Sequence, residues 1–251
     1  MDLTEVVKNF DGKKILVVGD VGLDRYIHGA CTRLCPEAPV PVFTPTRTES
    51  KAGLAGNVAT NLAHLGAQVK LCSIIGDDQE GVDLMDALDR YGNILNTEKY
   101  LCRDLSRTTI VKNRYVSDGH LLLRVDEENL KPFEEEMMER FLIGMLKEAW
   151  DWPDAIVVQD YGKGMVSSKL MDRLVRCRVA RNIPLVVDPS IKQNPGIYEG
   201  ASYLKPNRKE IEEIKKELRL IDEFCVLRSL KLNGLLVTLG GDGMVPYTTD
   251  T

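Results

Sequence analysis

Short apolar runs that alternate with amphipathic stretches constrain the fold of this chain more than any other feature. A continuous apolar run of this length is typical of a parallel strand that is buried on both faces. The runs are Ile15–Val18, Val69–Ile75, Ala155–Val158, Leu185–Val187 and Leu235–Val237. The alternation predicts an α/β fold with a mostly parallel sheet and helices on both of its faces.

Helical periodicity separates these runs. Apolar residues recur at helical spacing between Ala55 and Ala63, and Gly66 follows where a C-terminal cap is expected. A second apolar stripe follows an acidic first turn, and we interpret it as core packing. Its members are Met138, Phe141, Leu142, Met145 and Ala149.

Two segments interrupt this alternation and predict a small inserted β lid. Val40–Thr44 and Thr108–Val125 alternate in polarity and are rich in β-branched residues, and Ser117-Asp118-Gly119 is typical of a turn. We expect the lid to comprise residues 38–46 and 107–126, and to lie over the carboxyl ends of the strands.

Composition excludes several classes of protein. A chain of 251 residues with 43% hydrophobic residues suits a single globular domain, predicted here to span residues 1–251. The net charge of -5 gives no basic footprint for nucleic acid. The first residues contain no long apolar run, so neither a signal peptide nor a membrane partner is indicated. We expect a cytoplasmic protein.

Polar residues follow two of the predicted elements in positions suited to a sugar. Asp20 and Asp24 come just beyond the first strand, where open α/β sheets bind ligands, although acids in a solvated loop explain them equally well. Gly53 and Asn57 lie at the predicted start of a helix, where backbone N–H groups are free. A helix that packs closely through small residues is the alternative.

Three further residues suit phosphates. Lys163, between two glycines after a strand, could bind a phosphate or lie in a surface turn. Asn207 and Glu210 form the pattern of a helix capping box. The functional alternative is that this pair orders water bound to Mg²⁺ beside a nucleotide.

Together and in this order, these segments resemble the ribokinase-like family of carbohydrate kinases, and within it the branch that phosphorylates heptose 7-phosphate at the anomeric hydroxyl for lipopolysaccharide precursors. The resemblance runs nearly from end to end. It rests on "GKKILVVGDVGLDRY", "PEAPVPVF", "AGLAGNVATNLAHLGA", "SRTTIVKNRYVSDGHLLLRVDEE", "QDYGKGM", "VVDPS", "LKPNRKE" and "VTLGGDGM".

The resemblance implies an ATP- and Mg²⁺-dependent kinase that dimerises through its β lid. The residues that it implies for the sugar are Asp20, Asp24, Gly53 and Asn57. Those that it implies for the nucleotide side are Asn207 and Glu210, with Mg²⁺ and phosphates, and Thr238, Gly240 and Gly243 along the nucleotide.

The sequence departs from the family pattern at three places. Ser190 follows the Asp-Pro step, where the family often has a lysine. Leu54 stands where the family has the second of two glycines. The family's Gly-Ala-Gly-Asp element, whose Asp is the general base, has no match after Val237, so we expect a kinase domain that is incomplete at its C-terminus. The turn dipeptide Asp242-Gly243 and the nearby Pro246 predict a strand or hairpin here, and exclude Asp242 as the base.

Two alternatives to a heptose kinase stay open. One is a catalytically inactive homologue that binds a sugar phosphate or acts as a scaffold. The other is a kinase for another sugar whose remaining part comes from a separate chain.

Overall fold

The computed structural model describes residues 3–128, 133, 135–141, 144, 147 and 150–248. Its main sheet has the strand order β12-β11-β10-β9-β8-β1-β4-β5, and all neighbours are parallel except the edge pair β11–β12. The strands are β1 (Lys14–Gly19), β4 (Gln68–Gly76), β5 (Leu101–Asp104), β8 (Ala155–Gln159), β9 (Leu185–Asp188), β10 (Tyr203–Leu204), β11 (Gly234–Thr238) and β12 (Met244–Thr248).

Side chains of strand β1 alternate between two hydrophobic cores, which is why both faces of the sheet carry helices. Leu16 and Val18 pack in one core with residues of α5 (Glu135–Arg140), α7 (Ser168–Arg181), α8 (Arg208–Leu218) and α9 (Glu223–Ser229). Ile15 and Val17 pack in the other core with residues of α2 (Ala55–His64) and α3 (Gln79–Asp89). The predicted α/β fold is confirmed.

The short helices complete the element order and test the second predicted stripe. They are α1 (Leu3–Lys8), α4 (Thr97–Tyr100) and the 3-10 turns η2 (Pro195–Tyr198) and η3 (Gly240–Asp242). Met138 and Phe141 are buried in the core, as the stripe predicts. Leu142, Met145 and Ala149 lie outside the described residues. Within the described part of the chain, no helix is long and apolar enough to cross a membrane.

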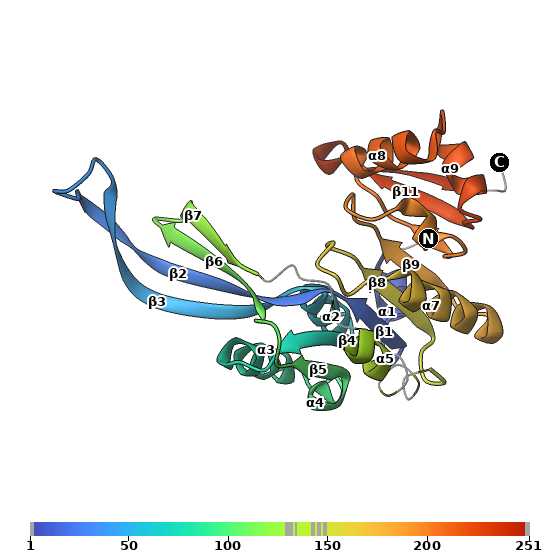
Figure 1. Cartoon of the computed structure of the whole chain (residues 1–251), viewed down its shortest axis with the longest axis horizontal. Helices are drawn as coiled ribbons and strands as arrows, with labels where there is room; N and C mark the ends of the chain where they lie inside the picture. Colours follow the sequence, from blue (N-terminus) through green and yellow to red (C-terminus); the bar gives the residue numbers. More distant parts are fainter. Residues whose placement is uncertain are drawn as a thin grey trace.

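A second sheet, the lid, has the strand order β3-β2-β6-β7 and projects from the main sheet as a long arm (Figure 1). Its strands are β2 (Val21–Leu34), β3 (Pro41–Leu54), β6 (Ile110–Ser117) and β7 (His120–Glu127). The predicted turn is present, with positive φ at Asp118 and Gly119. The lid is larger than predicted, because β2 and most of β3 extend the sheet beyond residues 38–46.

Candidate active site

Asp20 is the only residue between β1 and β2, and its carboxylate organises a loop of the main sheet. Its Oδ2 accepts hydrogen bonds from the N–H groups of Tyr161 (2.9 Å) and Lys163 (3.1 Å), and its Oδ1 accepts one from Met165 (3.0 Å). Burial raises the pKa of Asp20, and these backbone hydrogen bonds oppose the rise. This geometry supports the 160–165 loop, and a role for Asp20 in holding sugar stays a prediction.

Asp24 and Gly53 lie side by side on strands β2 and β3. A Cβ atom on Gly53 would stand 2.8 Å from Oδ2 of Asp24, so a larger residue here would require this carboxylate to shift. The solvated-loop alternative is wrong for Asp24, which lies in strand β2. Gly53 was expected at the start of a helix, but it pairs with Gly22 of β2, and helix α2 begins at Ala55. Tertiary pairing of the lid strands thus brings these two residues together.

Helix α2 starts directly after a strained residue. Leu54 has φ 56° and ψ -129°, a conformation that favours glycine, at the position where the sequence has lost the family's second glycine. Asn57 is exposed on the first turn of α2 and lines a hollow between β3, α2 and the end of α3. The structure does not bring Asn57 into the pocket described below, and its role as a sugar ligand stays a prediction.

Lys163 uses its side chain within the protein. Its Nζ forms an ion pair with Glu128, just after lid strand β7, while its N–H binds Asp20. The contact joins the lid to the 160–165 loop. A phosphate at Lys163 would compete with Glu128, so the predicted phosphate role is not evident from this arrangement.

A pocket of about 400 Å³ lies at the carboxyl ends of β8, β9, β10 and β11. This edge is where ligands bind in open α/β sheets. Several predicted nucleotide-side residues line it. The lining residues are Gln159, Asp160, Tyr161, Asp188, Pro189, Ser190, Ile191, Lys192, Lys205, Asn207, Glu210 and Thr238.

Asn207 and Glu210 form the capping box of helix α8. Oδ1 of Asn207 accepts hydrogen bonds from the N–H groups of Lys209 (2.9 Å) and Glu210 (3.0 Å), and Oε2 of Glu210 accepts one from the N–H of Asn207 (2.7 Å). Burial raises the pKa of Glu210. The cap hydrogen bond uses Oε2 of Glu210, so the same carboxylate can serve the cap and still face bound water through Oε1.

The turn after β11 begins directly beyond Thr238, which lines the pocket. Thr238 donates its N–H to the carbonyl of Pro206 at 2.9 Å. Gly240 and Gly243 have φ +65° and +87°, which this tight turn requires. Asp242 is exposed and pairs with Arg208 at 3.1 Å, and strand β12 follows. The predicted strand after residue 243 is confirmed, and no helix begins at Asp242.

Sequence reasoning missed two side-chain networks in this pocket. Asp188 accepts a hydrogen bond from Gln159 (2.8 Å) and pairs with Lys205 (3.0 Å). The second network is buried: Tyr198 donates its hydroxyl to Asp160 at 2.8 Å. Burial raises the pKa of Asp160 to about 6. The signal for both acids was their place directly after a buried strand; Tyr198 and Lys205 carried no such signal.

Tyr161 lies between the two groups of predicted residues. Burial raises the pKa of its hydroxyl, and the carboxylates of Asp188 and Asp24 raise it further. Asp188 belongs to the pocket and Asp24 to the lid, so both groups are close enough to act electrostatically on one side chain. Among the described residues no group of three or more His, Cys, Asp or Glu side chains is arranged to hold a metal ion.

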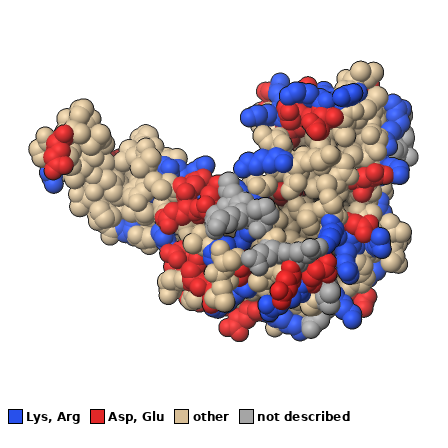
Figure 2. All heavy atoms as spheres, viewed as in Figure 1, with Lys and Arg blue, Asp and Glu red and all other residues tan. Residues whose placement is uncertain are grey.

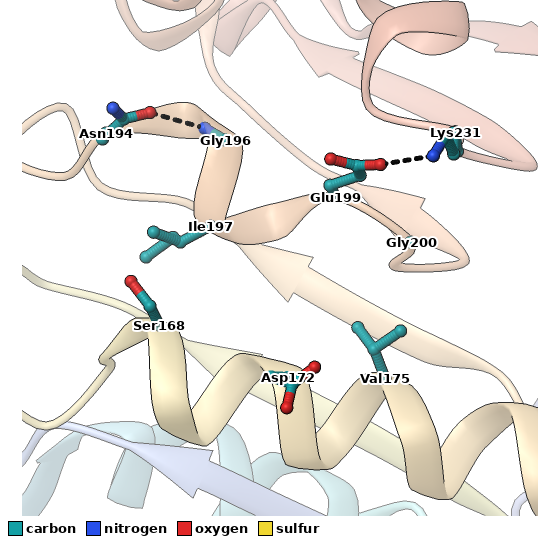
Figure 3. A pocket seen from close by; sticks show the side chains of 9 residues that line it. All are labelled: Ser168, Asp172, Val175, Asn194, Gly196, Ile197, Glu199, Gly200 and Lys231. Carbon is teal, nitrogen blue, oxygen red and sulfur yellow. Dashed lines mark hydrogen bonds and ion pairs between the residues drawn. The ribbon is translucent and has the colours of Figure 1, made fainter.

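A larger groove, of about 700 Å³, lies elsewhere, between α7 and the η2 region (Figure 3). Ile197 and Val175 line it from opposite sides, and Glu199 pairs with Lys231 at its rim. None of the predicted site residues lines this groove. The carboxyl-edge pocket is therefore the better candidate for the active site.

The comparisons with known proteins agree with this geometry. A sequence model of the pfkB family of carbohydrate kinases matches residues 13–251. The chain belongs to this family. Two curated relatives, each called bifunctional protein HldE, are 40% identical: the one from Hyphomonas neptunium over 93% of this chain and 48% of its own length, and the one from Pseudomonas paraeruginosa over 94% and 48%. The chain thus spans about half the length of these relatives.

Solved structures of carbohydrate kinases share the fold. A carbohydrate kinase from Agrobacterium tumefaciens superposes with a TM-score of 0.70 at 22% identity, over 95% of this chain and 74% of that one. Arabidopsis thaliana ribokinase, solved with ribose and ATP, superposes with a TM-score of 0.62 at 15% identity, over 96% of this chain and 76% of that one. At these sequence identities, the similarity to the two solved structures shows only that the fold is shared.

Proposed function

We propose that this chain is the kinase part of an enzyme that transfers the γ-phosphoryl group of ATP to the anomeric hydroxyl of heptose 7-phosphate. The observation that carries the proposal is the 40% identity to the two HldE proteins over nearly the whole chain. The heptose-type segments "GDVGLDRY" and "PEAPVPV" support the same substrate.

In this proposal the lid sheet binds the sugar and the main sheet binds ATP. Asp24, beside the close approach of Gly53, accepts hydrogen bonds from sugar hydroxyls. ATP occupies the carboxyl-edge pocket, where Lys205 and the turn after Thr238 meet its phosphates. Mg²⁺ would neutralise charge on the transferred phosphoryl group, and Glu210, with Asp188 close by, would hold its water. Tyr161 lines the ATP pocket, and the centre of its ring lies 5.4 Å from Nζ of Lys112 on lid strand β6, so it is near both groups.

The general base is assigned to none of the described residues. Asp242 is exposed and held by Arg208, and the 251 residues contain no Gly-Ala-Gly-Asp sequence. We therefore expect this chain, tested alone, to bind its substrates and to turn them over poorly.

The test combines calorimetry and an ATP-consumption assay with heptose 7-phosphate. Binding of both substrates with little turnover is expected, and an Asp242→Asn variant should behave like the wild type. Turnover at about 1–100 per second, the ordinary range for kinases, would contradict our inference that this chain lacks the general base. If the chain bound another sugar phosphate in preference, the assignment of heptose as the substrate would be rejected, and the proposal of a sugar kinase would stand.

We further propose that two copies associate through the lid. Leu121, Leu122 and Leu123 of β7 are 57%, 47% and 56% exposed. On the face shown in Figure 2, the outer part of the lid carries few charges apart from a cluster at its tip, whereas acidic and basic side chains gather where the lid meets the body. An exposed apolar patch of this kind is typical of a surface that a partner covers.

A further inference from the structure

Two cations of strand β6 lie on the face of the lid that carries Asp24. Lys112 and Arg114 are two residues apart, so their side chains project from the same face of the sheet. The strand register sets Lys112 between Asp24 of β2 and Asp126 of β7, and it sets Arg114 one pair further along, beside Arg124. Both cations therefore flank the carboxylate that we assign to the sugar.

Arg114 has a donor without an acceptor. Its Nη2 donates to Oδ1 of Asp24 at 2.8 Å, and its guanidinium carbon lies 5.6 Å from the centre of the Tyr26 ring. Its Nε–H is buried and has no hydrogen-bond partner among the described residues. Because buried donors in proteins are almost always paired, this N–H calls for an acceptor that the described chain does not supply.

Lys112 has no direct counter-ion among the residues that the structure describes. Its Nζ lies 5.4 Å from the centre of the Tyr161 ring, and within the described chain it forms no ion pair. Other cations of this face are paired, Lys51 with Glu49 at 3.0 Å and Arg124 with Asp126 at 2.8 Å. Partial burial lowers the pKa of Lys112, while the charges of Asp24 and Asp126 on the neighbouring strands raise it.

The charges on this face leave room for an anion. Apart from the Lys51–Glu49 pair, three cations of strands β6 and β7, Lys112, Arg114 and Arg124, stand against two carboxylates, Asp24 and Asp126. A sugar hydroxyl could accept from Nε of Arg114 but would leave the Lys112 ammonium uncompensated. A phosphate monoester does both, because it carries about -1.5 to -2 charges and several acceptor oxygens.

We propose that Lys112 and Arg114 form a subsite for the phosphate that the sugar already carries when it binds. The subsite makes the protein select sugar phosphates over the same sugars without phosphate. The inference rests on the proposed function in one respect, namely that Asp24 holds the sugar, since this fixes the ligand beside β6.

The first experiment measures binding to the 251-residue chain by calorimetry, with heptose 7-phosphate and unphosphorylated heptose. Lys112→Met should weaken binding of the phosphorylated sugar at least tenfold and leave the affinity for heptose unchanged. Arg114→Lys, which keeps the charge but removes Nε, should weaken the phosphorylated sugar selectively as well. Lys51→Met, a paired lysine of the same face, is the matched control and should change neither affinity. Equal losses for both sugars, or no loss, would overturn the subsite.

A second measurement separates this proposal from the proposed function. The pKa of Lys112 is followed by NMR of ¹³C-labelled lysine, assigned through Lys112→Met, with and without inorganic phosphate. Phosphate should raise this pKa. If it does and heptose 7-phosphate does not bind, the heptose assignment fails and the subsite stands. If heptose 7-phosphate binds while phosphate leaves the Lys112 pKa unchanged, the subsite fails and the kinase proposal stands.

Discussion

Arg114 of the lid and Asp24 of β2 form an ion pair at 2.8 Å, with about a fifth of each side chain exposed. The pair joins neighbouring lid strands that run parallel, and it fixes the carboxylate next to Gly53. The residue that we assign to the sugar is thus held by the lid itself, so lid geometry and sugar binding should depend on each other.

Asp24→Asn should weaken sugar-phosphate binding at least tenfold, because the neutral amide loses the charge-assisted hydrogen bonds to sugar and to Arg114. The free energy of unfolding should fall by about 1–2 kcal/mol, since Arg114 then keeps a partly buried charge. Calorimetry and urea unfolding measure the two effects. Asp83→Asn, which breaks the ion pair of Arg25 at the lid base, should leave sugar binding intact. Unchanged sugar binding in Asp24→Asn would reject the assignment.

At position 54, the glycine variant should be at least as stable as the alanine variant, which is the reverse of the usual order of stability. The φ of 56° with ψ -129° at Leu54 costs about 1–3 kcal/mol for a residue with a side chain, and glycine avoids that cost. Leu54→Gly should therefore be at least as stable as Leu54→Ala in urea unfolding. At Leu88, buried in helix α3, the glycine variant should be about 1 kcal/mol less stable than the alanine variant. The same order at both positions would show that Leu54 is unstrained.

Asp160 should make the protein less stable as pH rises through weakly acidic values. Its folded-state pKa of about 6 lies above the ordinary value of 3.8, so the folded state binds the proton more tightly than the unfolded state. The stabilisation from this proton is complete below pH 3.8 and is lost as pH rises to about 6. Wild type should lose on the order of 1–3 kcal/mol relative to Asp160→Asn between pH 4 and 7. Parallel stability curves for the two proteins would contradict this.

Glu210→Gln separates the cap from the nucleotide site. Glutamine can still accept the hydrogen bond from the N–H of Asn207, so stability should change by less than about 0.5 kcal/mol. The lost charge should weaken Mg²⁺-dependent ATP binding several-fold, measured by calorimetry with and without Mg²⁺. Glu213→Gln, on the same helix and paired with Lys216, serves as the control. If ATP binding were unaltered, Glu210 would have no role in binding the nucleotide and would serve only the helix cap.

Leu123→Glu should turn a lid-mediated dimer into a monomer, because it introduces a charge into the exposed apolar strand β7. Light scattering coupled to size-exclusion chromatography gives the mass. Leu105→Glu, at an exposed leucine outside the lid strands, should leave the mass unchanged. A monomeric wild type, or a dimer that survives Leu123→Glu, would exclude the lid as the interface.

The sequence alone determined five of the eight strands of the main sheet, β1, β4, β8, β9 and β11, because strands buried on both faces must be apolar throughout. It also determined the turn at Asp118-Gly119 and the cap at Asn207, since both depend on residues close together in the chain. The strand after Gly243 followed from local turn chemistry in the same way.

Only the tertiary structure decided how the candidate site is assembled. The sequence analysis predicted no strand over residues 21–34, yet they pair with β3 and β6 in the lid. That pairing sets Asp24 beside Gly53 and Arg114, far apart in sequence. The carboxylate of Asp20 looked free to bind sugar until folding brought the N–H groups of Tyr161, Lys163 and Met165 around it. Hydrogen-bond partners from distant segments leave no local pattern, so the sequence named most of these residues without fixing what each one contacts.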